Sequence, residues 1–574
     1  MDSRSAAHVL SQIAAYLELA SDNRFKARAY RMAARSLLAL GVDDLAPLLR
    51  SGELAKVRGL GPATIKVVRD LVETGESRYL EQLRQATPEG LLELMNVPGL
   101  TAEKVRKLHA ELDISSLEEL ELAAQDGRLA KLRGLGPKTA QRILAGISFL
   151  RDAAPLSLYP HAAAHADHLV ASIRSHPDVV RAEIAGSVRR RREVVGDVDV
   201  VASCARDPSA IAESFTRMSG IRTASSVDGT ASIRYIDGTR LDLYCVSPAS
   251  FGVGLWRATG SAEHVARVTQ RLEARGVTLE GDMLRDARGA AIAAETEEQV
   301  YAAAGLTWVP PELRESGDEI EAAARGTLPQ LIELDDLQGV LHCHTTYSDG
   351  KSTIAQMVES ARAKGWKYLG VSDHSQAAFY ASGVAREMML EQHDEIDALN
   401  ATLEDFHVLK GVEADILADG HLDYDDELLG RFDYVIGSIH SRFKMDEAAM
   451  TSRILRAMDD PHLTILAHPT GRLLLTRDGY AIDVDAVLQK AADVGVAVEV
   501  NADPHRLDLD WRYLHRAKQL GVMVEIGPDA HSRGGLEWTE LGVAMARKGW
   551  LEARDVLNTR DASDVTAFAT RRRQ

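Results

Sequence analysis

The C-terminal part of the sequence alternates short runs of Val, Ile and Leu with longer helical stretches. The apolar runs include GVLHCHT from Gly339, YLGVSDH from Tyr368, YVIGSIH from Tyr434 and VMVEIGPDAH from Val522. Amphipathic segments such as TIAQMVESARAKGW separate them. Regular alternation of buried strands and helices favours a parallel sheet, so residues 337–574 are expected to form a distorted (β/α) barrel of about seven strands.

Nearly every one of these runs ends in a side chain that can bind a metal ion. In parallel α/β barrels the functional side chains gather at the C-terminal ends of the strands. A lone His there is more often a hydrogen-bonded structural residue, but a full set with carboxylates predicts about two or three Mn²⁺, Zn²⁺ or Fe²⁺ ions. Cys343 lies on the opposite strand face from its His neighbours and is predicted to be core. The candidate ligands are His342, His344, Asp349, His374, Glu413, His440, His468, Asp529 and His531.

The N-terminal part contains an internal repeat. VRGLGPATIKVV from Val57 and LRGLGPKTAQRI from Leu132 are strict copies, and MNVPGLTAEKVRKL from Met95 is a looser one. The glycines permit a tight hairpin, Pro starts the next helix, and the backbone N–H groups then face an anion. The pattern predicts helix-hairpin-helix units that bind DNA phosphates; a purely structural, glycine-capped turn is the alternative. The candidate contacts are Gly59, Gly61, Gly99, Gly134, Gly136 and Lys138.

The middle of the chain places carboxylates on predicted strands. In EVVGDVDVVASC, Asp197 and Asp199 lie two residues apart and therefore share a strand face. A later strand, in RLDLYCVSP, adds Asp242. Three such carboxylates form an oxygen-rich site suited to Mg²⁺ or Mn²⁺, although alternating Asp residues on a strand can also simply face solvent.

A turn and a basic segment precede these aspartates. AGSVRRRREVVGD contains Gly186 and Ser187 at the predicted turn, followed by Arg189–Arg192. A hydroxyl, backbone amides and Arg190 there could hold the oxygens of a triphosphate. Together with the third Asp, this turn favours a nucleotidyl-transfer site.

Charge and cysteine content limit the partners and the location. The formal net charge of −18 at pH 7 argues on its face against a nucleic-acid partner. Phosphate binding depends on local patches, however, and the run of arginines is one. Three cysteines without framework spacing and the lack of a signal-peptide or membrane-span pattern predict a cytoplasmic location without a membrane partner.

The middle region resembles the palm of the family X DNA polymerases, the polymerase-beta-like nucleotidyltransferases. The resemblance rests on GSVRRRREVVGDVDVV, RLDLY and TGS, and the hairpin repeats are similar to that family's lyase and fingers subdomains. It implies that Asp197, Asp199 and Asp242 are catalytic and hold two Mg²⁺ or Mn²⁺ ions that activate the primer 3′-hydroxyl and hold the triphosphate. The implied nucleotide contacts are Gly186, Ser187, Arg190, Thr259 and Gly260.

The barrel resembles the PHP (polymerase and histidinol phosphatase) family. The family's order of His-x-His, Asp, His, Glu, His, His-Pro and Asp-x-His is complete here. It implies hydrolysis of phosphoesters with the help of divalent ions. NADPHRLDLDW from Asn501 is typical of the copy fused to bacterial family X polymerases, and Arg506 within it is a candidate phosphate or DNA contact. Pairing of Arg506 with a nearby Asp is an equally open interpretation.

Several positions depart from the family X pattern. Arg257 and Ala258 stand where family members have Tyr-Phe, and Val265 stands where they use an Asn against the base. These departures leave sugar discrimination and the activity of the nucleotide pocket open.

The expected 5′-phosphate pocket is present without its lyase residue. Lys26 and Tyr30 in RFKARAYRMAAR match the pocket, but the family's lyase lysine aligns with Val67. Lys66 is adjacent but points about 100° away around a helix. The resemblance therefore implies 5′-phosphate binding without an efficient Schiff-base lyase.

The resemblance covers nearly the whole chain and implies a multidomain α/β protein. The expected parts are a helical lyase-like domain 1–88, fingers 89–153, an α+β palm 154–250 and thumb 251–315, a linker 316–336 and the barrel 337–574. The implied function is repair synthesis by a monomer at the nucleoid, on gapped or nicked DNA with a 5′-phosphate and dNTPs, with a 3′→5′ exonuclease and abasic-site endonuclease or 3′-phosphatase activity in the barrel. Two alternatives stay open: a DNA-binding nuclease with an inactive palm, and a small-molecule phosphatase.

Overall fold

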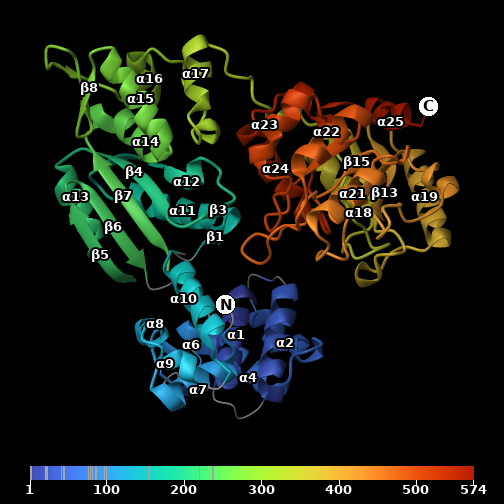
Figure 1. The fold of residues 1–574 in the computed structure, drawn as a ribbon, viewed down its shortest axis with the longest axis horizontal. Coiled ribbons are helices and arrows are strands. Elements are labelled where there is room, and N and C mark those ends of the chain that lie inside the picture. Colours follow the sequence, from blue (N-terminus) through green and yellow to red (C-terminus); the bar gives the residue numbers. More distant parts are fainter. Residues whose placement is uncertain are drawn as a thin grey trace. The chain divides into compact units, whose positions relative to one another are not determined.

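A computed structural model describes residues 3–573 except 20–23, 41, 43–44, 75–76, 78, 81, 84–86, 89, 96, 98–99, 133, 153–155, 219 and 236–237. The chain divides into two compact units, Met1–Ala154 and Pro155–Gln574 (Figure 1). The predicted contact Gly99 lies outside the described residues. Within the part that is described, no helix combines the length and the apolar character needed to cross a membrane.

The first unit is helical, as the sequence predicts, and has two hydrophobic cores. Leu10, Ile13 and Val68 belong to the first core, and Val105 and Ile143 to the second. The helices α1 and α2 are amphipathic and pack against each other through the first core. The helices are α1 (Ser3–Leu19), α2 (Arg24–Leu40), α3 (Ala46–Ser51), α4 (Pro62–Thr74), α6 (Gly90–Leu94), α7 (Ala102–Leu112), α8 (Leu117–Gln125), α9 (Arg128–Lys131) and α10 (Pro137–Asp152).

The two strict repeats form equivalent hairpins. Gly59 and Gly134 adopt φ angles of +95° and +91°, a region that L side chains rarely occupy. Pro62 and Pro137 begin the following helices α4 and α10. A Cβ built on Gly61 or on Gly136 would meet nothing within 4 Å, so packing within the described chain does not require glycine there. The open backbone at these two turns is accessible to a ligand.

The second unit begins with the palm, whose five-stranded sheet has the order β2-β4-β7-β6-β5. β4 and β7 run parallel, and their register pairs Asp199 with Asp242. The palm elements are β1 (Ser157–Leu158), α11 (Tyr159–Arg174), β2 (Val179–Ile184), α12 (Gly186–Arg189), β3 (Val194–Val195), β4 (Val198–Cys204), α13 (Pro208–Phe215), β5 (Ile221–Val227), β6 (Thr230–Tyr235) and β7 (Arg240–Val246).

The thumb follows and extends into the predicted linker. Ile320 and Ala323 of α17 pack in the same core as Trp256 and Leu272. Residues 318–325 are therefore part of the thumb's core, because the apolar face of this acidic helix is buried. The elements are α14 (Phe251–Thr259), α15 (Ala262–Ala274), β8 (Thr278–Glu280), β9 (Met283–Arg285), β10 (Ala291–Ile292), α16 (Glu297–Ala304) and α17 (Asp318–Arg325).

The barrel contains seven parallel strands in sequence order, β11 to β17. Beyond the strand ends, a parallel bridge joins Cys343 to Ala530 and nearly closes the sheet. The His344 backbone N–H donates to the Ala530 carbonyl at 3.0 Å, and the Ala530 N–H donates to the His342 carbonyl at 3.2 Å. The elements are β11 (Gly339–Val340), α18 (Ile354–Ala363), β12 (Tyr368–Val371), α19 (Arg386–Asn400), β13 (His407–Asp415), α20 (Asp426–Leu429), β14 (Tyr434–Ser438), α21 (Glu447–Ala457), β15 (Ile465–Leu466), α22 (Val484–Val494), β16 (Ala497–Asn501), α23 (Trp511–Leu520), β17 (Val524–Gly527), α24 (Thr539–Lys548) and α25 (Ala562–Arg571).

The Gly186 turn gives a test of the palm's packing. Gly186 has φ +58°, and a Cβ there would lie 1.8 Å from Asp199 Oδ2. Gly281 has nearly the same backbone angle, φ +59°, but a Cβ there would meet nothing within 4 Å. We expect Gly281→Ala to cost about 1–2 kcal/mol from the backbone alone, and Gly186→Ala to cost about 1–3 kcal/mol more from overpacking.

Urea unfolding of both variants, followed by circular dichroism, measures this difference. Equal destabilisation by the two substitutions would show that the palm accommodates a side chain beside Asp199 and would contradict the close approach.

Candidate metal centres and nucleotide site

The palm's three carboxylates come from two neighbouring strands: Asp199 on β4 is the register partner of Asp242 on β7, and Asp197 directly precedes β4. Burial, followed by repulsion from Asp197 and Asp242, raises the pKa of Asp199 to about 7. Burial and the charge of Asp242 also raise the pKa of Asp197. The Tyr244 hydroxyl donates to Asp199 Oδ1 at 3.3 Å, and Ser232 Oγ donates to Asp242 Oδ1 at 2.5 Å. Concentrated negative charge of this kind is what a divalent cation would neutralise.

The oxygens of these carboxylates are spread rather than clustered. Among the described residues, they do not form a group whose ligand atoms all lie within 4.8 Å of one another. Like charges repel, which favours rotamers that keep them apart. A pocket of about 390 Å³ lies beside Asp197 and Asp242 and is lined also by Ser225, Ser232 and Arg240. The site therefore combines carboxylate oxygens with space for a substrate.

The turn before the basic segment lies directly against the carboxylates. Gly186 is in contact with Asp199, so the turn and β4 are fixed relative to each other. Ser187 Oγ is buried and has no hydrogen-bond partner among the described residues. Arg190 Nη1 donates to the Thr259 carbonyl at 2.7 Å, and its Nε lies 3.2 Å from Glu315 Oε1. A hydroxyl and a guanidinium thus lie near β4 and its aspartates, as a triphosphate site requires.

The Thr259–Gly260 turn connects the thumb to this segment. The Thr259 side chain is fully buried and accepts from Arg189 Nη1 at 2.8 Å. Arg189 also pairs with Glu297 at 2.7 Å, and Glu297 in turn binds the buried Arg314 at 2.5 Å. The Gly260 N–H donates to the Trp256 carbonyl and ends α14. These predicted nucleotide contacts therefore serve the junction of palm and thumb in this structure.

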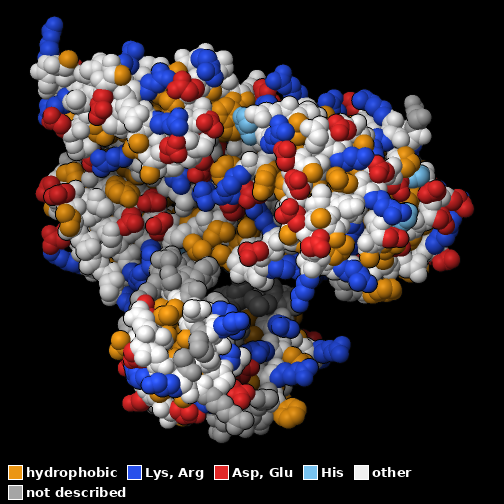
Figure 2. Space-filling view, in the orientation of Figure 1, with side chains coloured by type: hydrophobic (Ala, Val, Ile, Leu, Met, Phe, Trp, Pro, Cys, Tyr) orange, Lys and Arg blue, Asp and Glu red, His pale blue; other side chains and the backbone are white. Residues whose placement is uncertain are grey.

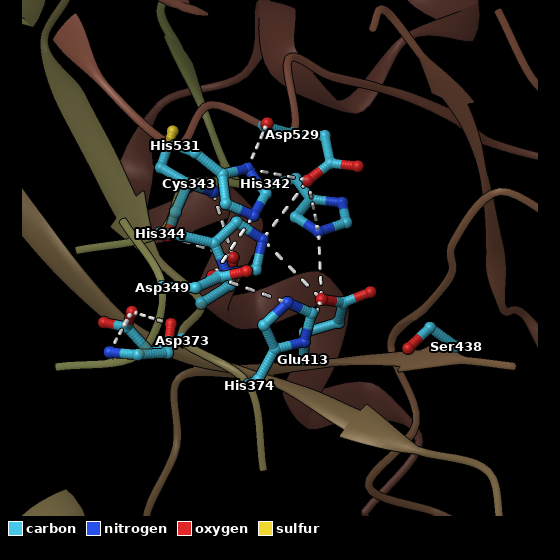
Figure 3. A network of polar contacts seen from close by, with 12 residues as sticks. His342, Cys343, His344, Asp349, Asp373, His374, Glu413, Ser438, Asp529 and His531 are labelled. Atoms are coloured by element: carbon cyan, nitrogen blue, oxygen red, sulfur yellow. Dashed lines mark hydrogen bonds and ion pairs between the residues drawn. The ribbon is translucent and has the colours of Figure 1, made fainter. Parts of the chain in front are cut away.

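The barrel brings all of its predicted ligands to one rim. His344, Asp349, His374 and His531 form one group, and their ligand atoms all lie within 4.8 Å (Figure 3). Two further groups overlap with it through His344 and His374. They are His342 with His344 and Asp529, and His374 with Glu413 and His440. His468 Nε2 lies 3.0 Å from Glu413 Oε1 and completes the predicted set. Groups that share members suit several ions at bridging distances.

The donor atoms fit divalent metal ions. His342 Nε2 and both ring nitrogens of His344 are buried and have no hydrogen-bond partner among the described residues. His342 Nε2 lies 3.5 Å from Glu413 Oε2, and His344 Nε2 lies 3.3 Å from Asp529 Oδ1. Nitrogen and oxygen ligands that each lie about 2.0–2.2 Å from one ion are separated by roughly 3.0–3.5 Å. The spacing therefore fits nitrogen and oxygen atoms that share one ion.

Further acidic and amide groups form hydrogen bonds to the candidate ligands and orient them. Glu499 Oε1 lies 2.5 Å from His342 Nδ1, and its Oε2 accepts from the His468 backbone N–H at 2.6 Å. Asn501 Nδ2 donates to Asp529 Oδ2 at 3.1 Å. A hydrogen bond of this type fixes the tautomer and the orientation of a ligating His. Glu499 and Asn501 were not predicted from the sequence, although a Glu inside the apolar run VAVEVNA was a usable signal.

Asp415 fixes the orientation of His440 in the same way. Its Oδ1 lies 2.8 Å from His440 Nδ1, which leaves Nε2 directed toward Glu413 at 3.3 Å. Burial alone would lower the pKa of His440, but Glu413 and Asp415 outweigh it and raise that pKa to about 9. Burial also opposes the charge on His531, whereas Asp349 and then other carboxyl groups raise its pKa to about 9. Both imidazoles therefore hold a proton at neutral pH until a cation displaces it.

Two other imidazoles stay neutral. Burial and the neighbouring His531 lower the pKa of His344 to about 4. Burial and Arg506 lower the pKa of His468 to about 3. These rings are deprotonated at neutral pH and can bind a metal ion without losing a proton.

Two of the ligands occupy strained backbone conformations. His468 has φ +27° and Asp529 has φ +49°, in the left-handed region that side chains disfavour. Such residues cost about 1–3 kcal/mol each and persist where the surrounding structure fixes them. Both lie at strand ends of the barrel rim, so the strain is located at the site itself.

Arg506 lies at the edge of this centre. Its Nε is 3.5 Å from Asp529 Oδ2, and its side chain is 21% exposed. Burial opposes the charge, but Asp529 and Glu413 raise the pKa of Arg506 above its ordinary value. The structure thus contains the Asp pairing that the sequence left open, beside a position where a phosphate could bind.

The predicted 5′-phosphate pocket is a small aromatic and cationic cluster in the first unit. Lys26 Nζ lies 2.6 Å from the Tyr79 hydroxyl, and the Tyr30 and Tyr79 rings are 6.0 Å apart. Burial and then Tyr79 raise the pKa of Tyr30 to about 12, so it keeps its proton. Tyr79 was not predicted, because only its distance from Lys26 in the fold identifies it. Figure 2 shows Lys and Arg gathered over α2, where Lys26 and Arg28 are exposed.

The positions that depart from the family pattern have clear locations. Val67 is buried in the first core, whereas Lys66 is exposed on the same helix. Arg257 Nη2 pairs with Asp282 at 2.7 Å, and its Nη1 donates to the Gly281 carbonyl. Arg257 is thus engaged with the β8–β9 turn of the thumb.

Family models match most of the chain's parts. A helix-hairpin-helix domain matches residues 1–77, a SAM-like helix-hairpin-helix tandem matches 91–148, a DNA polymerase beta thumb matches 254–315 and a PHP domain matches 341–502. A DNA polymerase/3′-5′ exonuclease PolX of Bacillus subtilis is 36% identical over 575 residues, covering 100% of both chains. Probable phosphatases of Clostridium acetobutylicum and a Thermoanaerobacter species are 30% and 28% identical. They cover 33% and 38% of this chain and 78% and 90% of their own length.

Substituting two buried glutamates on neighbouring strands tests whether Glu499 orients a metal ligand or contributes only to packing. Glu499 and Glu525 are register partners on β16 and β17, and both are fully buried. Glu499→Gln should weaken metal binding by about 10- to 100-fold, because His342 loses its carboxylate acceptor. Burial and then Glu499 raise the pKa of Glu525 to about 8, so Glu525 is protonated at pH 7 and Gln is a close mimic.

Isothermal titration of Mn²⁺ into both variants at pH 7 measures the effect. We expect Glu525→Gln to bind within about twofold of the unmodified protein. Equal losses in the two variants would show that Glu499 acts only through packing.

Metal binding should release protons. The pKa values of His440 and His531, about 9, lie above the ordinary 6.5, so both rings are charged from pH 6.5 to about 9 and become neutral above it. Mn²⁺ affinity should therefore increase as the pH rises toward 9. Titrations at pH 7.5 in buffers of different ionisation enthalpy should give different apparent enthalpies; identical values would contradict proton displacement.

Proposed function

The chain belongs to the bacterial family X DNA polymerases that carry a C-terminal PHP domain, and we propose that it fills short gaps with a 5′-phosphate during DNA repair. It is a DNA-directed DNA polymerase with a 3′→5′ exonuclease, and both activities depend on divalent metals. The observation that carries the proposal is the presence of two separate carboxylate-rich centres on one chain. One lies on β4 and β7 of the palm, and the other lies on the barrel rim.

In the palm we assign nucleotidyl transfer to Asp197, Asp199 and Asp242. These residues would hold two Mg²⁺ or Mn²⁺ ions, whose charge favours ionisation of the primer 3′-hydroxyl and departure of pyrophosphate. Ser187 Oγ, which has no partner among the described residues, would donate to a phosphate oxygen. Arg190 would donate to the triphosphate with the N–H groups that Glu315 and Thr259 do not use.

In the barrel we assign phosphodiester hydrolysis at DNA 3′ ends. Two or three Mn²⁺, Zn²⁺ or Fe²⁺ ions held by the imidazoles and carboxylates of the rim would supply an activated water molecule and neutralise phosphate charge, as expected for a site with this donor set. Glu499 and Asp415 would keep His342 and His440 oriented. Arg506 would contact a phosphate at the edge of the site.

The first unit would bind the DNA on either side of the gap. Open backbone at Gly61 and Gly136 suits phosphate contacts that do not depend on sequence. Lys26 and Tyr30 would hold the 5′-phosphate. Since Val67 is buried in the core, we propose binding of this phosphate without efficient lyase chemistry. We propose that the protein acts as a monomer at the nucleoid in the cytoplasm, where DNA and dNTPs are available.

A second candidate activity is hydrolysis of abasic-site or 3′-phosphate ends. The similarity of residues in the barrel to proteins described as probable phosphatases favours it. A purely small-molecule phosphatase would leave the palm and the helix-hairpin-helix units without a role. The remaining alternative, a nuclease with an inactive palm, is tested by an extension assay.

A labelled one-nucleotide-gapped duplex in Mn²⁺ tests both centres. Asp242→Ala should reduce dNTP extension by at least about 1000-fold and leave 3′ shortening intact, because it removes a palm ligand only. His344→Ala should reduce 3′ shortening by about 100-fold or more and leave extension intact.

The same substrate without the 5′-phosphate provides the control for end recognition. We expect the phosphate to strengthen binding by about tenfold through charge-assisted hydrogen bonds. Shortening without any extension by the unmodified protein would overturn the polymerase assignment; loss of both activities in either variant would overturn the separation of the centres.

A further inference from the structure

A single buried carboxylate connects the barrel to the palm's basic segment. Glu315 lies in the thumb, just before α17, and its side chain is 9% exposed. Its Oε1 lies 2.7 Å from Lys548 Nζ and 3.2 Å from Arg190 Nε. Its Oε2 lies 3.3 Å from Arg192 Nη1. Three cations from two domains therefore converge on one acidic group.

Lys548 is the member of this cluster that the barrel domain supplies. It ends α24, and its side chain is fully buried. Besides Glu315, its Nζ donates to the Arg190 backbone carbonyl at 2.8 Å. Its ammonium group also lies 4.4 Å from the centre of the Trp511 ring. A buried lysine needs such partners, because an unpaired buried charge is strongly destabilising.

A second contact from the barrel holds the other end of the same segment. Glu193 Oε2 accepts from Trp511 Nε1 at 3.1 Å, and Glu193 Oε1 pairs with Arg512 at 2.8 Å. Arg190 and Glu193 lie between the Gly186 turn and the metal-binding strand β4. The barrel domain thus contacts the segment on which the palm's candidate phosphate contact lies.

We propose that Lys548 of the barrel domain is a positioning residue for nucleotide binding in the palm, acting on Arg190 through Glu315 and through the Arg190 carbonyl. This inference rests on the proposed role of Arg190 at the triphosphate. Lys548 touches neither the nucleotide nor the palm's aspartates. Its effect is to fix the backbone of Arg190 and to compensate the negative charge of Glu315.

The charge balance explains why Lys548 matters. The guanidinium of Arg190 has five N–H donors, and Glu315 and the Thr259 carbonyl engage its Nε and Nη1. With Lys548 present, Glu315 shares its charge among three cations. Without Lys548, Glu315 has only the two arginines for compensation and competes more strongly with a triphosphate for Arg190. The segment also loses the hydrogen bond that anchors its backbone.

The test compares Lys548→Met with two matched variants. Lys548→Arg keeps the charge at the same position. Arg547→Met removes the preceding residue of α24, which pairs across the same interface with Glu312 at 2.8 Å but does not contact Glu315 or Arg190. Steady-state extension of gapped DNA gives KM for dNTP and kcat, and 3′ shortening by the same preparations reports an intact barrel.

We expect Lys548→Met to raise KM for dNTP by about tenfold or more, with a smaller change in kcat and 3′ shortening within about twofold. Lys548→Arg should restore most of the affinity, and Arg547→Met should leave KM unchanged. An unchanged KM in Lys548→Met, or equal effects of Arg547→Met, would overturn the inference while the unmodified enzyme still extends primers. No extension by the unmodified enzyme would instead overturn the proposed function on which it rests.

If Lys548→Met alone loses 3′ shortening through misfolding, the double variant Glu315→Gln with Lys548→Met provides the measurement, because it removes one charge of each sign and keeps the net charge of the cluster unchanged. Its KM for dNTP should also be raised about tenfold, since the Arg190 guanidinium loses its contact with Glu315 and the Arg190 carbonyl loses its hydrogen bond from Lys548. A double variant with the affinity of the unmodified enzyme would show that Glu315 and Lys548 do not position Arg190.

Discussion

The contact between the first and last strand of the barrel determines the rest of the C-terminal half. The bridge between Cys343 and Ala530 places His342 and His344 beside Asp529 and His531. These two pairs come from opposite ends of the domain's sequence, and only a sheet that nearly closes brings them together. The strand order also accounts for most of the remaining candidates. His374, His440 and His468 lie just beyond β12, β14 and β15, Glu413 lies within the last residues of β13, and Asp349 lies in the loop after β11.

Charge compensation then defines what each centre can do. In the barrel, imidazoles and carboxylates alternate, so the pKa of Glu413 and that of Asp529 stay well below the usual range even though burial opposes it. In the palm, the described residues include no imidazole that pairs with the aspartates, and burial raises the pKa of Asp199 to about 7. The negative charge of the barrel centre is therefore partly balanced by its own imidazoles. The negative charge of the palm centre depends more heavily on a bound cation or on Arg190.

Much of this organisation could be predicted from the sequence, because it depends on local spacing. Ligands at strand ends, aspartates two residues apart on a strand and glycines at fixed positions of a hairpin each have a signature within a few residues. Tyr79 lacks one, since a Tyr in a helix has many uses, and Glu499 is marked only by being an acidic residue within an apolar run. The contact between Glu315 and Lys548 spans 233 residues of sequence, and neither residue stands in a distinctive motif. The packing of α17 on the thumb was similarly hidden, because its many charges resemble those of a solvated linker.

The near-closure of the barrel has a consequence for the protein's lifetime in the cell. The hydrogen bonds of this seam lie directly beside the ligands, so an ion bound there holds both edges of the sheet together. Ion loss would remove these cross-links and leave only the hydrogen bonds of the seam and the pairs of imidazole with carboxylate to hold its edges, which favours local opening of the seam. Metal starvation would then expose the strand edges to proteases and set the abundance of the enzyme as well as its activity.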